Sequence, residues 1–363
     1  MSTQPLISVI VPIFNAEPYL DQCLSSIEGQ TCRDLEIICL NDGSTDGSLE
    51  TMRAHAEDDR RIVVIDKSNQ GYGATCNRGL DEAHGKWISI IEPDDWIEPD
   101  MYRAMMAHAE SLDARVDIVK TPYWRIIDPD TPQQRKINCS YRRRVKVGAQ
   151  PFPISAAPHL LRHHPSIWSA VYRADFLREN GIRFHEIPGA GWADNPFLVD
   201  TLCQTDCIAY MDAPFYCYRE ETPEKSKATA LNNTMMPFDR WMDMADSIER
   251  IGRADETVLR ELYQRAFTYF DGTVEFTGER DDVMKAMTGI VNRMERVDLV
   301  LDNPDISPAQ KELFVRLRGL GDDARKRIKG GTWKKKLVGE ALYSLRNAGI
   351  GYTASMVKKT LGK

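Results

Sequence analysis

Two adjacent carboxylates, Asp94 and Asp95, follow directly after the largely apolar residues 88–91. Such a run is typical of a buried parallel strand, and ligands bind at strand ends in open α/β sheets. Two carboxylates at a strand end repel each other unless they face water, a cation or a basic partner. Mg²⁺ and Mn²⁺ prefer oxygen ligands and are typically held by one or two carboxylates together with substrate phosphates. The pair therefore predicts a divalent cation beside a diphosphate, and the alternative is a solvated turn that caps the next helix.

The elements that must position this pair alternate between strand and helix patterns over the first hundred residues. Strand patterns cover residues 6–12, 35–40, 62–65 and 87–91. An amphipathic helix is expected over residues 18–30. This alternation predicts an α/β fold with a doubly wound, mostly parallel sheet. Asp42, Asn69 and Asp94 would then gather beyond the carboxyl ends of the strands, where a nucleotide would lie.

Four short segments in order carry a resemblance to a known family. They are residues 11–15, 41–46, 69–71 and 92–96. Together they resemble the family 2 glycosyltransferases, which have the GT-A fold, and the resemblance covers about residues 5–220. It implies a Rossmann-like sheet and an inverting transfer of a sugar from a nucleotide diphosphate donor, assisted by a divalent metal ion.

The resemblance also implies roles for individual residues. The residues expected to bind the nucleotide-sugar are Pro12, Asn15, Asp42, Asn69, Gly71 and Asp94. Among them, Pro12 and Asn15 would border the base and the ribose, and Asp42 would accept a hydrogen bond from the base. Asp95 and Asp94 occupy the family's metal and ribose-diphosphate motif, with Mn²⁺ or Mg²⁺ as the expected ion.

Two positions depart from the family pattern. The family usually has Asp where this chain has Glu92, and it commonly has Arg where this chain has Cys76. A cation that would face the base or a phosphate is therefore missing. Arg78 is the nearest substitute, but on a helix it would point about 200° away from Cys76. A small core residue is the simplest interpretation of Cys76.

A lone acid, Asp194, is the candidate general base, because an inverting transfer needs a group that takes the proton of the acceptor hydroxyl. Asp194 follows the Gly-rich residues 187–193 and would open a helix, with Pro196 in its first turn. The stretch before it resembles the family's segment that leads to a Glu-Asp pair, which here reads Ala193-Asp194. Two alternatives stay open: Asp194 only caps the helix, or another acid, such as Glu186, is the base.

Three tryptophans, Trp96, Trp168 and Trp192, are candidates to line the acceptor cleft. Sugar rings have apolar faces that stack on aromatic rings, although each tryptophan could equally belong to the core. A second set of candidates follows the last strand shared with the family and would face the diphosphate: Arg219, Ser226 and Lys227.

The 363 residues provide for one sizeable α/β domain and an addition. Residues 1–230 are the expected GT-A catalytic domain, with a nucleotide-sugar half at 1–100 and an acceptor half at 101–230. Apolar residues then repeat at helical spacing, which predicts a helical region over 231–323 that could cover the acceptor cleft or mediate homo-oligomerisation. Residues 324–363 form a basic, amphipathic tail.

Basic residues concentrate in this tail. Residues 324–363 contain 11 Lys and Arg but one acid, Glu340, whereas the whole chain has a net charge of −7. An apolar stripe accompanies the cations: Trp333, Leu337, Val338, Ala341, Leu342 and Leu345. A basic amphipathic helix of this kind can lie on an anionic membrane surface, and the alternative is that it docks on the acidic catalytic domain.

The expected location is cytoplasmic, with peripheral binding to the inner face of the cell membrane. The eight cysteines show no CxxC spacing and no N-terminal signal segment is recognised, which predicts a reducing compartment without disulfides. The sequence has no run of about 18 apolar residues, so a membrane-spanning helix is not expected.

The sequence thus predicts an enzyme of polysaccharide biosynthesis. A UDP-sugar would be the donor, and a hydroxyl of a surface glycan or a lipid-linked saccharide the acceptor; no nucleic acid partner is expected. A nucleotidyltransferase would normally show a Gly-rich first loop with Arg or Lys, and residues 12–15 are not one. A catalytically inactive nucleotide-sugar-binding or scaffold protein is the other alternative, which Cys76 and Ala193 allow.

Overall fold

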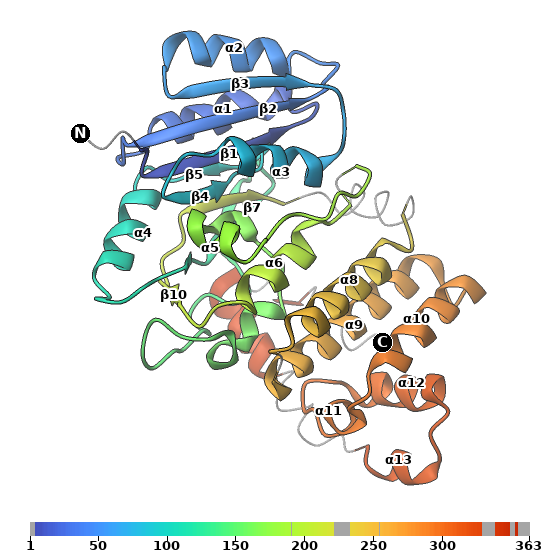
Figure 1. Cartoon of the computed structure of the whole chain (residues 1–363). Helices are drawn as coiled ribbons and strands as arrows, with labels where there is room; N and C mark the ends of the chain where they lie inside the picture. Colours follow the sequence, from blue (N-terminus) through green and yellow to red (C-terminus); the bar gives the residue numbers. More distant parts are fainter. Residues whose placement is uncertain are drawn as a thin grey trace. The chain divides into compact units, whose positions relative to one another are not determined.

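The computed structural model describes residues 4–189, 191–220, 233–253, 255–328, 338–348 and 353–354 (Figure 1). The chain divides into two compact units. One comprises residues 1–220 and 246–253, and the other comprises residues 221–245 and 254–363. The sequence predicted a boundary at residue 230. In the structure the first unit ends at residue 220 and also includes residues 246–253.

A seven-stranded sheet forms the centre of the first unit. Its strands are β1 (Ile7–Ile13), β2 (Leu35–Asp42), β3 (Ile62–Lys67), β4 (Trp87–Ile90), β6 (Ile118–Lys120), β9 (Ala170–Arg173) and β10 (Ile208–Tyr210). The strand order is β10-β6-β9-β4-β1-β2-β3, and β9 alone among them runs antiparallel to its neighbours. The predicted mostly parallel sheet is therefore confirmed.

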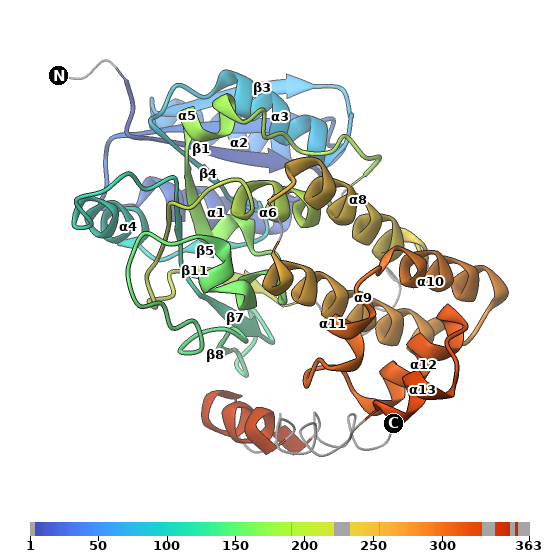
Figure 2. The same ribbon diagram turned by 60° about the horizontal axis from the view of Figure 1, so that its bottom comes forward.

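The central strands are buried because helices cover the sheet on both sides (Figures 1 and 2). The helices of this unit are α1 (Glu17–Glu28), α2 (Ser48–Asp58), α3 (Tyr72–Glu82), α4 (Met101–Glu110), α5 (Ala174–Glu179) and α6 (Asp194–Leu202). All seven residues of β1 are buried, as expected for a parallel strand that is covered on both faces. Helix α3 packs on β1 and β2, and it begins where the chain leaves β3.

A second, four-stranded sheet lies beyond the acidic pair. Its strands are β5 (Trp96–Ile97), β7 (Tyr123–Ile127), β8 (Arg135–Asn138) and β11 (Tyr216–Arg219), in the order β5-β11-β7-β8. Three short 3-10 helices cover residues Ile154–Ala156, Pro158–Leu161 and Ile167–Ser169. Because β5 follows directly after Asp95 and pairs with β11, the last strand of the unit lies against the acidic pair.

The second unit is helical in its described part, as predicted. Its helices are α8 (Met236–Ile251), whose last turns belong to the first unit, α9 (Glu256–Thr277), α10 (Asp281–Arg293), α11 (Val297–Leu301), α12 (Pro308–Arg318) and α13 (Asp322–Lys326). Residues 338–348 are also helical. Helix α9 lies beside α10 and α11 (Figure 2). Within the described ranges, none of the helices has both the length and the apolar character that a bilayer crossing requires.

Candidate active site

Asp95 is the more buried residue of the acidic pair, with 2% of its surface exposed. The hydroxyl of Tyr216 donates to one carboxylate oxygen at 2.7 Å, and the backbone N–H of Arg219 donates to the other at 2.6 Å. Burial, followed by the charge of Asp94, raises the pKa of Asp95. Both oxygens of Asp95 are thus held by β11, which fixes the end of β4 against the second sheet.

Asp94 is only partly buried, so its carboxylate is the more accessible of the two. Among the described residues, no three His, Cys, Asp or Glu side chains are grouped so that they could hold a metal ion by themselves. The carboxylates of Asp94 and Asp95 fit Mg²⁺ or Mn²⁺. Proteins often hold these ions with one or two carboxylates while substrate phosphates and water complete the coordination. The geometry makes Asp94 the better candidate ligand and gives Asp95 a supporting position behind it.

Glu92 links the acidic pair to two other parts of the unit. Its carboxylate oxygen Oε1 accepts a hydrogen bond of 2.5 Å from the hydroxyl of Tyr72, and its backbone N–H donates to the hydroxyl of Tyr216 at 3.2 Å. Burial raises the pKa of Glu92 to about 8, and the charges of Asp94 and Asp194 act in the same direction. Asp194 therefore lies within electrostatic reach of the acidic segment, although 99 residues separate it from Asp95 in the sequence.

The structure tests the alternative that Asp194 only caps helix α6. Helix α6 begins at Asp194, but its N-cap is Ala193 and no side chain caps it, so the predicted capping role was wrong. The side chain of Asn195 donates to Asp194 at 3.0 Å, and the carboxylate remains partly exposed. The rival base Glu186 accepts a hydrogen bond of 3.1 Å from Asn77 on α3.

The predicted nucleotide-binding residues Asn15, Asp42, Asn69 and Gly71 all lie beyond or at the carboxyl ends of β1 to β3. Asp42 is 3% exposed, and its carboxylate accepts from the backbone N–H groups of Gln70 at 2.8 Å and Gly71 at 2.9 Å. It also forms an ion pair with Lys67. Asp42 therefore shapes the turn that leads into α3.

The remaining predicted contacts of the nucleotide differ in accessibility. Asn15 has a positive φ of 51° and is exposed, and its side chain accepts from the backbone N–H of Thr45 at 2.8 Å. Asn69 is exposed as well. Pro12 is buried inside β1 opposite Leu40 of β2, so its side chain belongs to the sheet core.

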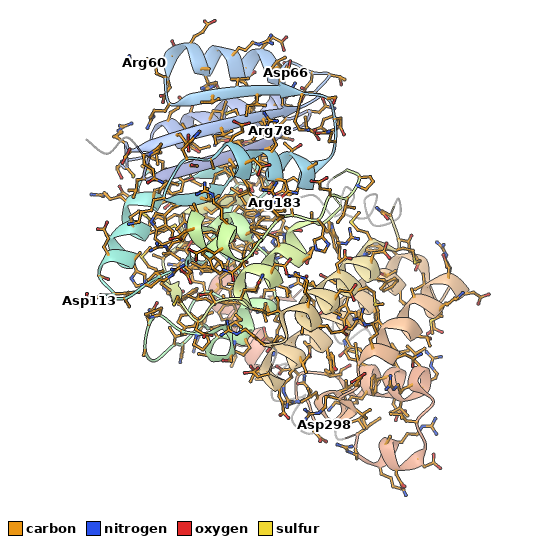
Figure 3. The ribbon with its side chains drawn as sticks, in the orientation of Figure 1. Arg60, Asp66, Arg78, Asp113, Arg183 and Asp298 are labelled. Carbon is orange, nitrogen blue, oxygen red and sulfur yellow. The ribbon has the colours of Figure 1, made fainter. Side chains whose placement is uncertain are left out.

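Neither Cys76 nor Arg78 supplies the cation that the family pattern places at position 76. Burial raises the pKa of the Cys76 thiol well above its usual range, so the thiol is neutral. Arg78 lies on the exposed side of α3 (Figure 3) and forms an ion pair of 2.6 Å with Glu82. Both findings agree with the predicted core role of Cys76.

The three candidate acceptor tryptophans differ in exposure and in their contacts. Trp168 is 2% exposed and stacks on Tyr216 with ring centroids 3.9 Å apart, so the prediction that it lines the acceptor cleft was wrong and the core alternative holds. The guanidinium of Arg219 covers the ring of Trp96 at 4.9 Å from the centroid. Trp192 is 38% exposed and is the best placed of the three for an acceptor.

Arg219, a candidate to face the diphosphate, makes several contacts within the protein. Its guanidinium also stacks on Tyr19 at 4.9 Å, forms an ion pair with Asp130 and donates to Gln22. The other two candidates for the diphosphate, Ser226 and Lys227, lie outside the described residues.

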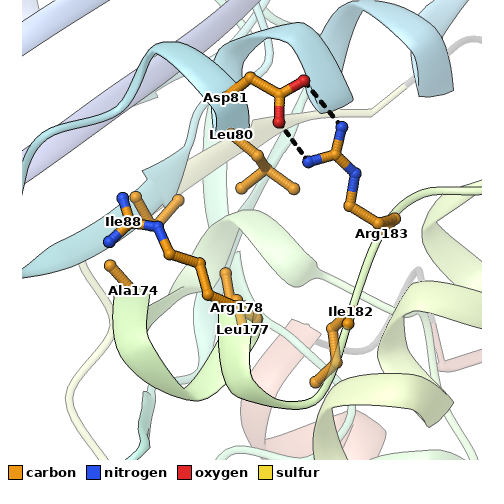
Figure 4. Close-up of a pocket in the computed structure, with 9 residues that line it drawn as sticks. Leu80, Asp81, Ile88, Ala174, Leu177, Arg178, Ile182 and Arg183 are labelled. Atoms are coloured by element: carbon orange, nitrogen blue, oxygen red, sulfur yellow. Dashed lines mark hydrogen bonds and ion pairs between the residues drawn. The ribbon is translucent and has the colours of Figure 1, made fainter.

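A cavity of about 320 Å³ lies apart from these residues, between α3, α5 and the segment that follows α5 (Figure 4). Leu80, Ile88 and Leu177 give it apolar walls, and an ion pair between Asp81 and Arg183 borders it. None of the predicted site residues lines this cavity. It is therefore separate from the candidate active site.

The part of the chain that contains the acidic pair matches a known family. Residues 8–168 match the model of the family described as glycosyl transferase family 2. The chain is 31% identical over 225 residues to the uncharacterized glycosyltransferase EpsJ of Bacillus subtilis strain 168. That alignment covers 60% of this chain and 61% of EpsJ, so the chain spans less than two thirds of the relative's length.

Solved structures of similar shape cover most of the chain. S. aureus TarS residues 1–349, solved in complex with UDP-GlcNAc, has a TM-score of 0.66 at 18% identity, with 91% of this chain and 92% of that chain covered. The mannosyltransferase PcManGT from Pyrobaculum calidifontis, solved in complex with GDP-Man and Mn²⁺, has a TM-score of 0.53 at 17% identity, with 87% and 86% covered. At these identities the likeness shows the fold, and the predicted GT-A fold is confirmed.

Proposed function

We propose that the chain is an inverting glycosyltransferase, because residues 8–168 match the model of glycosyl transferase family 2. The observation that carries the proposal is that Tyr72 contacts both the acidic segment, through its hydroxyl bond to Glu92, and the segment before Asp194, through its backbone bond to Gly189. A general base and a diphosphate site on one edge are the two requirements of a single-step transfer. A UDP-sugar is the proposed donor, in line with the UDP-GlcNAc complex of TarS.

In the proposed reaction, Asp194 takes the proton of the acceptor hydroxyl as its oxygen attacks the anomeric carbon. The bond from that carbon to the diphosphate breaks, and UDP leaves with the electron pair. Asp194 is suited to this step because it is partly exposed. Trp192, two residues earlier and exposed, would offer a stacking surface to the acceptor sugar.

Asp94 would hold the metal ion, with Asp95 fixed behind it by β11. When bound, Mn²⁺ or Mg²⁺ supplies positive charge that stabilises a departing diphosphate. The Mn²⁺ complex of PcManGT supports the choice of ion. The acceptor we propose is a hydroxyl of a surface glycan or a lipid-linked saccharide.

The direct test is release of UDP from a panel of UDP-sugars, with and without glycan or lipid-linked acceptors and with Mn²⁺ or EDTA. Metal-dependent release that an acceptor accelerates is the expected result. Binding of UDP-sugars without any release would instead identify an inactive nucleotide-sugar-binding protein. Release of pyrophosphate from a sugar phosphate and UTP would identify a nucleotidyltransferase.

We further propose that the tail binds an anionic membrane surface on the cytoplasmic side. Val338, Leu342 and Leu345 are 61%, 51% and 43% exposed, and their spacing of four and three residues puts them on one helical face. Trp333 and Leu337, the other large members of the predicted stripe, lie outside the described residues. Lys and Arg near an anionic surface contribute about 1 kcal/mol each, and the apolar face adds buried area.

Vesicles of phosphatidylcholine with phosphatidylserine test this part of the proposal by co-sedimentation. Binding should weaken with salt without vanishing, and replacing Val338, Leu342 and Leu345 with Ser should abolish most of it. Val63→Ser is the matched control, since Val63 is 48% exposed in β3. Equal binding of both variants would exclude a role of the apolar face, and absence of wild-type binding at low salt would remove the membrane role.

A further inference from the structure

The first turn of α3 lies unusually close to the segment that leads to Asp194. A Cβ atom on Gly71 would stand 2.8 Å from the backbone oxygen of Ile187, and one on Gly73 would stand 2.1 Å from that of His185. Neither distance is possible for a real Cβ, and Gly71 also has a positive φ of 91°. The two glycines therefore allow a backbone contact between parts of the chain that are more than 100 residues apart.

Tyr72, between the two glycines, connects three parts of the candidate site. Its backbone N–H donates to the backbone oxygen of Gly189 at 3.0 Å, and its hydroxyl donates to Glu92 at 2.5 Å. Its ring packs on Phe184 in a T-shaped arrangement, with ring centroids 5.8 Å apart. Phe184 in turn stacks on Phe197 of α6, with ring centroids 4.0 Å apart. One residue thus contacts the acidic segment, the segment 184–189 and, through one ring, the helix that begins at Asp194.

The contact with Glu92 is chemically important because of where that carboxylate lies. Glu92 lies two residues before Asp94, and its side chain reaches across to α3. The Tyr72 hydroxyl is the side-chain donor that the structure gives this carboxylate. Cys76, one helical turn after Tyr72, is a neutral thiol and brings no positive charge to the same face of α3. A shorter Asp at position 92 would end about one carbon–carbon bond short of the hydroxyl.

We propose that Tyr72 is a positioning residue that holds the acidic segment 92–95 and the Asp194 segment at a fixed separation. Its hydroxyl holds Glu92, and its backbone and ring hold residues 184–189. The inference rests on the proposed function only for its kinetic consequence, because the contacts themselves are independent of any reaction. It explains why this chain combines Tyr72 with Glu92 at two positions far apart in the sequence.

Tyr72→Phe in the full chain removes the hydroxyl and keeps the ring and the backbone contact. We expect kcat for transfer to fall by about 10–100-fold, the usual effect of losing a partner that orients a ligand, while KM for the UDP-sugar stays unchanged. Glu92→Leu removes the acceptor at a similar side-chain size and should have a similar effect, and the double variant should be no worse than the poorer single variant, because both changes remove the same interaction. Glu92→Asp should resemble Tyr72→Phe.

Tyr102→Phe is the matched control. Tyr102 is fully buried on α4, and its hydroxyl makes one hydrogen bond of 3.0 Å to Ser89. A purely structural role of Tyr72 predicts equal losses of thermal stability and unchanged kcat in both variants, which would overturn the proposal. Additive effects of Tyr72→Phe and Glu92→Leu on kcat would also overturn it.

Hydrogen–deuterium exchange separates this inference from the proposed function. In Tyr72→Phe, residues 91–95 and 184–195 should exchange faster than in the wild type and in Tyr102→Phe. If the wild type turns over no donor, the proposed function fails, and faster exchange still supports the positioning role. Unchanged exchange in both segments rejects it, whatever the activity.

Discussion

The two acidic segments of the candidate site are held in opposite ways. Asp95 is 2% exposed, and both of its oxygens accept hydrogen bonds from a strand that lies more than 120 residues later. Asp194 is partly exposed in the first turn of a helix, and close backbone packing against α3 holds the segment before it. The difference fits the two tasks proposed for these segments. Carboxylates that locate a metal ion need a fixed position, whereas a base needs access to the incoming hydroxyl.

The largest effect on kcat should come from the more accessible acid, Asp194. Asp194→Asn should lower kcat for transfer by roughly 10²–10⁴-fold, because the amide cannot take the proton of the acceptor. Binding of the UDP-sugar, measured by titration calorimetry, should be retained. Turnover close to that of the wild type would transfer the role of base to another acid, with Glu186→Gln as the next variant to measure.

The next effect distinguishes the two carboxylates of the acidic pair. Asp94→Ala should weaken Mn²⁺-dependent binding of UDP by more than the roughly 10–100-fold that loss of a supporting partner usually costs. The midpoint of urea unfolding should not change, because Asp94 is only partly buried. Wild-type UDP affinity in the presence of Mn²⁺ would exclude Asp94 as a metal ligand.

Asp95→Ala should behave differently from Asp94→Ala. It leaves the hydroxyl of Tyr216 and the backbone N–H of Arg219 without their acceptor, which costs about 1–3 kcal/mol of unfolding free energy. Urea unfolding of both variants under the same conditions is the measurement. Equal stability of the two would contradict the supporting role of Asp95.

The smallest effect tests the backbone packing on the Asp194 side. Gly73→Ala should destabilise the protein by roughly 1–3 kcal/mol, because its Cβ would stand 2.1 Å from the His185 oxygen. Gly289→Ala is the matched control, since Gly289 lies inside α10 with no atom within 4 Å of a Cβ. That change should stabilise by about 0.5–1 kcal/mol. Opposite signs in thermal unfolding are expected, and a stabilising Gly73→Ala would show that the contact is loose.

The parts predicted correctly from the sequence are those that local patterns determine. Strands β1 to β4 are apolar runs that end in turn residues, and α1 buries Leu20, Cys23, Leu24 and Ile27 at helical spacing. The second sheet escaped prediction because β5 has two residues and its partner β11 lies about 120 residues away. No periodicity can be recognised in two residues, and no single-sequence pattern reports such a pairing.

The residues of the candidate site could be chosen from the sequence, whereas their supporting contacts could not. Asp94, Asp95 and Asp194 stood out by their places after strands or Gly-rich turns. The burial of Asp95 depends on Tyr216 and could not be seen in the sequence, and the same is true of the stacking of Trp168. One signal was available for Tyr72, because glycines on both sides of an aromatic residue at a helix start indicate a close backbone approach.

The contact of residues 71–73 with residues 185–189 has a consequence for the exchange of parts between related enzymes. A chimera joined near residue 100, between the two halves of the catalytic domain, would combine α3 from one parent with residues 184–195 from the other. A parent with a larger residue in place of Gly73 would force the Asp194 segment away from the acidic pair. The smallest part that can be exchanged with this contact intact therefore contains both segments.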